Sequence, residues 1–287
     1  MAEVAVRFAV PAERLRPFLS TYWEMNISGD GFVNDLMHPE WANIRLPIDE
    51  QWLFGPTREN LTRVQGAIIH GPTSRPTFVR GHAGRAFGIG VLPTGWNRFW
   101  RAKASDYADR FAPLETVMGA DAGILETGLR TATGFEARAK VADTFMLDLL
   151  DRTKPASNEA QVRALFQVLI DPASATVEQI TSTLGLPQSR LARLSRRDFG
   201  FPPKLLLSRQ RFLRMLGTLH ARPYDEWPDF LDPQYLDQSH MIRDFQHFLG
   251  MAPSHYFALR RPILEAATKG RAELFGQPLQ GLHSPKG

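Results

Sequence analysis

The residues with the clearest chemistry lie in the segment 187–199, which contains four arginines. Leu191, Leu194 and Phe199 recur at helical spacing, so one side of the expected helix is buried. The remaining surface carries Ser189, Arg190, Arg193, Arg196 and Arg197. Because the planar guanidinium of arginine can pair with guanine O6 and N7, we expect Arg193 to read a base. The other three arginines are expected to hold phosphates.

A second segment, 237–249, combines a helix start with polar residues in its first turn. Asp237 can accept hydrogen bonds from the free amides of that turn, and Gly250 can end the helix. One side is apolar through Met241, Ile242, Phe245, Phe248 and Leu249. The other side carries Gln238, Ser239, His240 and Arg243. Such side chains hydrogen-bond base edges and phosphates, so this segment is typical of a recognition helix.

Charge is distributed unevenly along the chain. The net charge of +4 comes from residues 155–287, because basic and acidic residues balance in 1–154. Between Arg190 and Arg214 there are eight basic residues, including Lys204 and Arg209, and only one acidic residue, Asp198. A solvated helix face would usually mix Glu with Lys, so this clustering indicates a surface that binds a polyanion. We therefore expect Lys204 and Arg209 to contact DNA as well.

The elements around these segments form two helix-turn-helix patterns. Helices are expected at 158–170, at 176–184 and at 187–199, with Gly185 in the turn between the second and the third. Gly200-Phe-Pro-Pro203 breaks the chain before a long helix through Leu216. A last helix is expected from Pro253 to Leu264.

The second pattern resembles the C-terminal signature of the AraC family of transcription regulators. The resemblance rests on Asp237-Gln-Ser-His240, Arg243-Asp-Phe245, Gly250, Pro253-Ser254 and Tyr256, and it extends over 157–261. It implies a DNA-binding unit with two helix-turn-helix motifs joined by a long helix, and base contacts from Ser189. The segment 225–235 departs from the family pattern, because it contains two prolines and is acidic where an Ala/Leu-rich helix is usual.

The first hundred residues read as short strands separated by Gly and Pro, at 43–48, 66–70, 77–80 and 87–92. Helices are expected at 111–118, 121–131 and 135–150. A looser resemblance to the N-terminal domain of some AraC-type regulators rests on Leu15-Arg-Pro-Phe18 with Tyr22-Trp23, and on Gly90-Val-Leu-Pro93. It implies a cupin-like β-barrel that senses a small molecule or dimerises. Three aromatic residues are candidates for lining its pocket, although core packing explains them equally well: Trp41, Trp52 and Phe54.

Composition excludes several kinds of chemistry. The chain has no cysteine, which rules out disulfides, thiolate metal sites and a cysteine nucleophile. His38, His70 and His82 lack the spacing of metal ligands, so we expect neither a metal nor another cofactor. No catalytic set can be assembled from the sequence. No apolar run is long enough to span a membrane, and the N-terminus does not look like a signal peptide, which favours a cytoplasmic protein.

Together these patterns predict an α+β chain in three parts. Residues 1–154 would form the β-rich barrel or sandwich with trailing helices, 155–265 an all-α double helix-turn-helix domain, and 266–287 a loose tail. The expected partners are double-stranded DNA, a small-molecule effector and a second copy of the chain. Two alternatives remain open. The barrel could be a metal-dependent or small-molecule-binding enzyme with an appended helical domain, or the acidic second motif could bind a protein.

Overall fold

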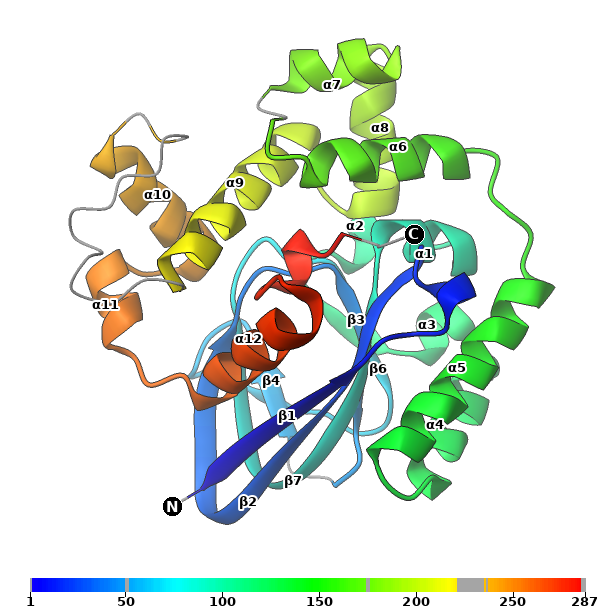
Figure 1. The fold of residues 1–287 in the computed structure, drawn as a ribbon, viewed down its shortest axis with the longest axis vertical. Coiled ribbons are helices and arrows are strands. Elements are labelled where there is room, and N and C mark those ends of the chain that lie inside the picture. The colour runs from blue at the N-terminus through cyan, green and yellow to red at the C-terminus, as the bar shows by residue number, and fades with distance from the viewer. Residues whose placement is uncertain (1, 50–51, 174–175, 221–234, 236, 285–287) are drawn as a thin grey trace.

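The computed structural model describes residues 2–49, 52–173, 176–220, 235 and 237–284, and it consists of a curled antiparallel sheet followed by helices (Figure 1). This confirms the predicted α+β class. The sheet order is β1-β2-β7-β3-β6-β8, and β4 pairs with both β5 and β7. The strands are β1 (Glu3–Ala9), β2 (Leu19–Met37), β3 (Ala42–Pro47), β4 (Trp52–Gly55), β5 (Thr62–Arg63), β6 (Ile68–His70), β7 (Thr77–Val91) and β8 (Phe111–Pro113).

The two long strands β2 and β7 form the centre of the sheet. Their pairing shifts register between Ile27 and Phe32, where β2 contains extra residues and bends. The strands predicted at 77–80 and 87–92 are therefore one continuous strand, and the turn expected between them is wrong. The glycines of 81–84 stay inside β7, where Gly81 leaves room for the Trp52 ring.

Five helices follow the sheet and cover one end of it: α1 (Pro93–Phe99), α2 (Ala104–Tyr107), α3 (Glu115–Met118), α4 (Asp121–Thr131) and α5 (Phe135–Arg152). The helices predicted at 121–131 and 135–150 are confirmed. The helix predicted at 111–118 is only partly correct, because Phe111 to Pro113 pair with β6. The long-range ladder overrides the local helical pattern at those three residues.

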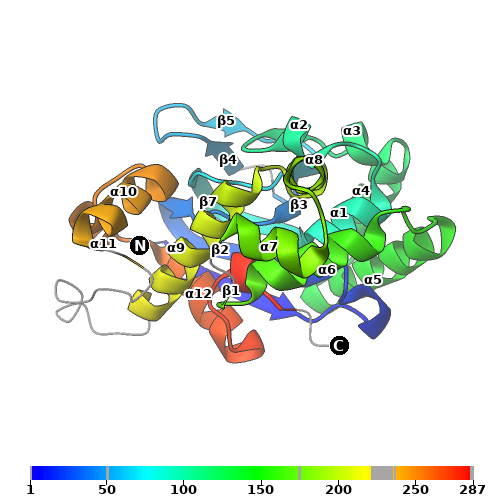
Figure 2. The ribbon, with the colours of Figure 1, turned by 90° about the horizontal axis from the view of Figure 1, so that it is seen from above.

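The second half is helical, as predicted. Its helices are α6 (Glu159–Ile170), α7 (Val177–Leu184), α8 (Gln188–Phe199), α9 (Pro203–His220), α10 (Gln238–Leu249), α11 (Pro253–Ala258) and α12 (Pro262–Phe275). Seen from above in Figure 2, α9 lies between the α6–α8 group and the α10–α11 group. The segment 221–234, where the first helix of the second motif was expected, lies outside the described residues.

The apolar core is continuous between the sheet and the helical half. Trp41 and Leu92 share one cluster of buried side chains with α6, α7, α8 and α9. Leu36 of β2 shares another cluster with α9, α10 and α11. The chain is also held in place just after the boundary predicted between 154 and 155, because Asn158 donates a hydrogen bond to Asp198 and accepts one from Asn97. The two halves are therefore firmly packed together and do not resemble two domains on a flexible tether.

The described residues of the predicted tail, 266–284, pack against the rest of the protein and do not form the loose tail that we predicted. The expected last helix ends early, at Ala258, and a new helix, α12, begins at Pro262. Asp35 of β2 accepts hydrogen bonds from the Ile263 and Leu264 amides at 2.7 and 3.0 Å, and so caps α12. Figure 1 shows α12 lying across β1, which its sequence alone did not reveal because its partner is the other end of the chain.

Candidate nucleic-acid interface and ligand cavities

The first helix-turn-helix is formed by α7 and α8. Thr176 caps α7, since it accepts from the Gln179 amide while the Gln179 side chain accepts from the Thr176 amide. Gly185 follows with φ +60°, a conformation that few other residues adopt without strain. Leu191 and Phe199 lie on one side of α8, and both are buried. The capped turn and this buried side fix which face of α8 points outward.

The outward face of α8 carries the five residues predicted from the sequence. All are exposed: Ser189, Arg190, Arg193, Arg196 and Arg197. Within the described part of the chain, the side chains of Arg190, Arg193 and Arg196 have no hydrogen-bond or ion-pair partner. Nε of Arg197 lies 4.0 Å from Oδ1 of Asp198. Lys204, in the first turn of α9, is exposed too. Unpaired guanidinium groups on a rigid helix form a surface that attracts phosphate and base acceptors.

Arg209 was predicted to contact DNA, and this prediction is wrong. The side chain is fully buried between α9 and the sheet. It donates hydrogen bonds to the carbonyl oxygens of Glu40 and Thr73 at 3.3 and 3.0 Å. Burial lowers the pKa of Arg209 to about 9. Its role is to join α9 to the sheet, which a count of basic residues cannot distinguish from a surface role.

The second recognition helix, α10, has the predicted start and end. Asp237 accepts from the His240 amide at 2.7 Å, and Gly250 ends the helix in the left-handed region. Gln238, Ser239 and Arg243 are exposed. Four of the five apolar side chains of the predicted stripe are buried in the cluster shared with α9: Met241, Phe245, Phe248 and Leu249. The fifth, Ile242, is exposed, which corrects that part of the prediction.

His240 has a different environment from the one expected of a DNA contact. Its Nε2 lies 3.0 Å from Nη2 of Arg211 on α9, and its ring is half-buried. Because a guanidinium can only donate, Nε2 is the acceptor in this contact. The structure therefore places the His240 ring against α9, whereas the neighbouring Gln238 and Ser239 lie on the exposed side of α10.

The three aromatic ligand candidates are core residues, which corrects the prediction for all of them. The ring of Trp41 packs edge-on against Phe166 and Phe199. Trp52 and Phe54 stack at 6.5 Å inside the sheet and are almost fully buried. The alternative of core packing is the one that holds, because all three rings are buried within clusters of core side chains.

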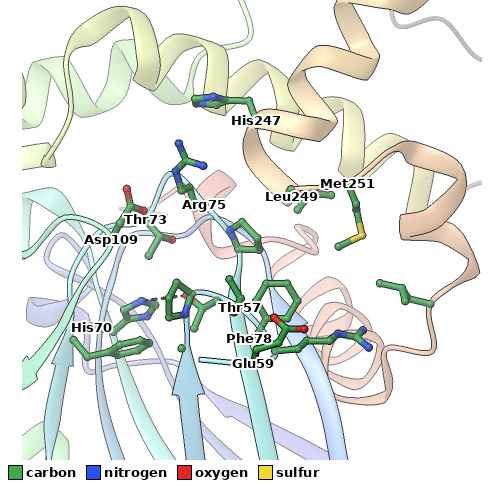
Figure 3. A pocket seen from close by; sticks show the side chains of 18 of the residues that line it. Thr57, Glu59, His70, Thr73, Arg75, Phe78, Asp109, His247, Leu249 and Met251 are labelled. Carbon is green, nitrogen blue, oxygen red and sulfur yellow. Dashed lines mark hydrogen bonds between the residues drawn. The ribbon is translucent and has the colours of Figure 1, made fainter. Parts of the chain in front are cut away.

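A cleft of about 590 Å³ lies between the sheet and the end of α10 (Figure 3). Its floor contains His70, whose ring stacks on Phe111 at 4.1 Å, and its far wall contains Leu249 and Met251. Figure 3 shows Arg75 and His247 toward the end of the cleft away from His70. The volume suits a small molecule. However, His70, the fully buried polar residue at the floor, already contacts Thr77 and Glu40.

A smaller cavity of about 60 Å³ lies inside the sheet beneath α12. Phe8, Trp23 and Met25 supply apolar walls, and Gly88 allows the Trp23 indole to lie flat on β7, because a Cβ there would come within 2.1 Å of the ring. Three charged residues also line it: Glu40, Arg45 and Arg271. Sequence analysis missed this site, since its residues come from β1, β2, β3 and α12.

The charges of this cavity do not balance. Arg45 forms an ion pair with Glu40, which His70 also approaches at 3.6 Å. Burial alone would raise the pKa of Glu40, but Arg45 and His70 hold it below its usual value. Arg271 is only 5% exposed, and its Nε and Nη2 have no hydrogen-bond partner among the described residues. The charge of Glu40 acts on Arg271, but Glu40 already pairs with Arg45, so two buried guanidinium groups share one carboxylate and the cavity favours a further anion.

Comparisons with known proteins show distant likeness in fold alone. No protein-family model matches the chain, and no curated protein matches it. Apo ToxT from Vibrio cholerae aligns with a TM-score of 0.44 at 8% identity, over 90% of this chain and 98% of that chain. ToxT with a bound unsaturated fatty acid aligns at 0.43 and 7%, over 89% and 94%. The AraC-like transcriptional activator CuxR aligns at 0.27 and 14%, over 74% and 86%.

Two further observations concern the described residues as a set. None of their helices has both the length and the apolar character needed to cross a bilayer. In the same part of the chain, no group of three or more His, Asp or Glu side chains is arranged to hold a metal ion.

Proposed function

We propose that this protein is a sequence-specific, double-stranded-DNA-binding transcription regulator of the AraC type. The observation that carries the proposal is the outward face of α8, where three arginines without protein partners lie on a helix whose other face is buried. Arg193 and Ser189 would read bases, while Arg190, Arg196, Arg197 and Lys204 would hold phosphates. On α10, Gln238, Ser239 and Arg243 would read a second box.

The length of α9, the helix between them in the chain, supports this proposal in outline. α9 connects them as one continuous helix of 18 residues, which is about 27 Å long at 1.5 Å per residue. Two recognition helices held about one turn of DNA apart can enter successive major grooves. The affinity would come mainly from α8, because the described part of α10 has one arginine, Arg243, and is flanked by acidic residues.

Selection from random duplex DNA with the full-length protein tests the proposal. Full-length protein is needed because the helical half shares its core with the sheet. At low salt we expect an enriched motif that contains two boxes about one helical turn apart, and weaker binding at higher salt. From the same pool, the variant Arg193→Ala should enrich sequences that differ from those selected by the wild-type protein. Absence of any enriched sequence at low salt would remove the proposed function.

We further propose that residues 1–154, together with α12, form the sensor part, and that its effector is a small organic anion. Arg271 would pair with the anionic group, and Gln280, whose Oε1 has no partner among the described residues, would orient it if its amide turned toward the group. The apolar walls would take the carbon chain, and flexible Met25 and Met37 could adapt to different lengths. A bound anion would stabilise α12 against the sheet and so influence α11 and α10.

Thermal unfolding in acetate, butyrate or octanoate at constant ionic strength tests this effector class. We expect Tm to rise with the carboxylates and not with the matched alcohols. Arg271→Met should fold, because replacing an unpaired buried charge by an apolar group of similar length is often neutral or stabilising. It should lose the response to carboxylate. An unchanged response in this variant would exclude Arg271 as the anion site. Homodimer formation stays a prediction.

A further inference from the structure

Four side chains at the junction of α9 and α10 contact one another, mainly through their polar atoms. Nη2 of Arg211 lies 2.9 Å from Oδ2 of Asp244 and 3.0 Å from Nε2 of His240. The Tyr235 hydroxyl donates to the same Asp244 oxygen at 2.9 Å. The Tyr235 ring meets the His240 ring edge-on at 5.0 Å, and the Arg211 guanidinium lies 5.0 Å from the Tyr235 ring centre. Arg211 of α9 therefore contacts two successive turns of α10, and also Tyr235, which lies shortly before α10 in the chain.

The position of these residues on α10 explains what the contact can do. His240 and Asp244 are four residues apart and lie on one face of the helix. Phe212 of α9 packs against Phe245 and Phe248 at 5.2 and 5.0 Å, which holds the two helices together. Apolar packing is only weakly directional, whereas hydrogen bonds to two successive turns fix the rotation of α10 about its own axis.

Rotation matters because the base-reading side chains proposed for α10 lie on its exposed side. With side chains, a helix has a radius of about 5–6 Å, so a rotation of about 20° moves a side-chain tip by about 2 Å. A displacement of that size breaks a hydrogen bond to a base edge. The exposed residues that depend on this rotation are Gln238, Ser239 and Arg243.

We propose that Arg211, Asp244, Tyr235 and His240 form a clamp that sets the rotation of α10 on α9 and thereby determines which bases the second helix-turn-helix reads. The inference rests on the proposed DNA-binding function. The four residues are positioning residues and need not touch DNA themselves. This assigns His240 a role in orienting the helix, in place of the direct DNA contact expected from its position in the first turn.

The test uses three full-length variants, Arg211→Lys, Tyr235→Phe and Asp244→Asn. Lysine has a single ammonium group and cannot reproduce the planar fork, while the other two changes remove one partner with little change of shape. Thr218→Ala is the matched control, because Thr218 is exposed on the same helix α9 and, among the described residues, its hydroxyl bonds only to the Arg214 carbonyl. Each protein is measured on the operator selected by the wild-type protein and on operators with either box scrambled.

We expect scrambling the second box to weaken wild-type and Thr218→Ala binding about ten-fold or more, and to have little effect on the three clamp variants. Scrambling the first box should weaken all five proteins equally, and Tm should remain within a few degrees of the wild-type value. Retention of second-box discrimination by all three variants overturns the inference, as does equal loss at both boxes. A wild-type motif with only one box also overturns it. Failure of the wild-type protein to select any sequence overturns the proposed function, and the inference with it.

Discussion

The guanidinium carbon of Arg209 lies 3.8 Å from the centre of the Trp41 ring, in the fully buried contact between α9 and the sheet. A desolvated cation–π contact contributes on the order of 2 kcal/mol. The same side chain donates hydrogen bonds to the main-chain carbonyl oxygens of Glu40 and Thr73, which lie between strands of the sheet. The orientation of α9, which lies between α8 and α10 in the chain, is therefore determined partly by contacts with the N-terminal half of the protein.

Arg209→Ala should lower the free energy of unfolding by about 2–4 kcal/mol, because it leaves a cavity and removes the donor to the buried Thr73 carbonyl, while the Glu40 carbonyl keeps the Thr73 amide. Urea denaturation measures this loss. Lys204→Ala, a change of an exposed residue in the first turn of the same helix, should cost less than about 0.5 kcal/mol. If Arg209→Ala kept full stability and only weakened DNA binding, the buried position described for the Arg209 side chain would be wrong.

Arg193→Ala should relax specificity at one base pair of the first box. The loss of a bidentate contact to guanine is worth about 1–3 kcal/mol of discrimination against the other bases. Binding to a panel of operators with single substitutions measures this effect. Equal weakening on every operator in the panel would show that Arg193 contacts a phosphate.

Arg196→Ala should weaken binding to all sequences by a similar factor. The removal of one phosphate contact should reduce the slope of log K against log salt concentration by about 1. A salt titration of operator and random DNA gives both slopes. A change confined to the operator would indicate that Arg196 reads a base.

Deletion of residues 266–287 should destabilise the protein, in contrast to what a loose tail would do. It removes most of α12 and exposes the apolar residues of β1 and β2 beneath it, including Phe8. We expect lower Tm and reduced solubility on expression. Lys269→Ala, an exposed change on α12, is the control and should leave Tm nearly unchanged. A truncated protein with wild-type Tm would contradict the observed packing.

Stability should fall as the pH is lowered from about 6.5 to about 4, partly through His220. Burial, assisted by the nearby charge of Arg261, lowers the pKa of His220 from its ordinary value of 6.5 to about 4 in the folded protein. The unfolded chain therefore takes up a proton first, so this contribution is complete above pH 6.5 and lost toward pH 4. Its slope is at most about 1.4 kcal/mol per pH unit.

His220→Asn should therefore show a shallower pH dependence than the wild-type protein in urea denaturation between pH 6.5 and 4. The imidazole of His38, which contacts the same Tyr256 hydroxyl, acts in the same direction, because burial lowers its pKa too. Asp35 acts in the opposite direction, since burial raises its pKa to about 6. Equal slopes for the two proteins would show that His220 does not contribute.

Several helix boundaries and caps were predictable from the sequence, because they depend on residues within a few positions of each other. Asp237 and Gly250 bound α10 as expected, and Gly185 makes the turn before α8. The apolar spacing of α8 also predicted correctly which of its side chains are exposed. Each of these features follows from local hydrogen bonding and from the 3.6-residue period of a helix.

Only the tertiary structure decided what lies opposite each side chain. Arg193 and Arg209 look alike in the sequence, yet one is exposed and the other is buried against Trp41. The cavity at Arg271 joins β1 to a helix more than 250 residues later, and the clamp at Arg211 joins two helices across the segment 221–234. Burial and charge pairing depend on contacts between distant segments, and no local pattern encodes them.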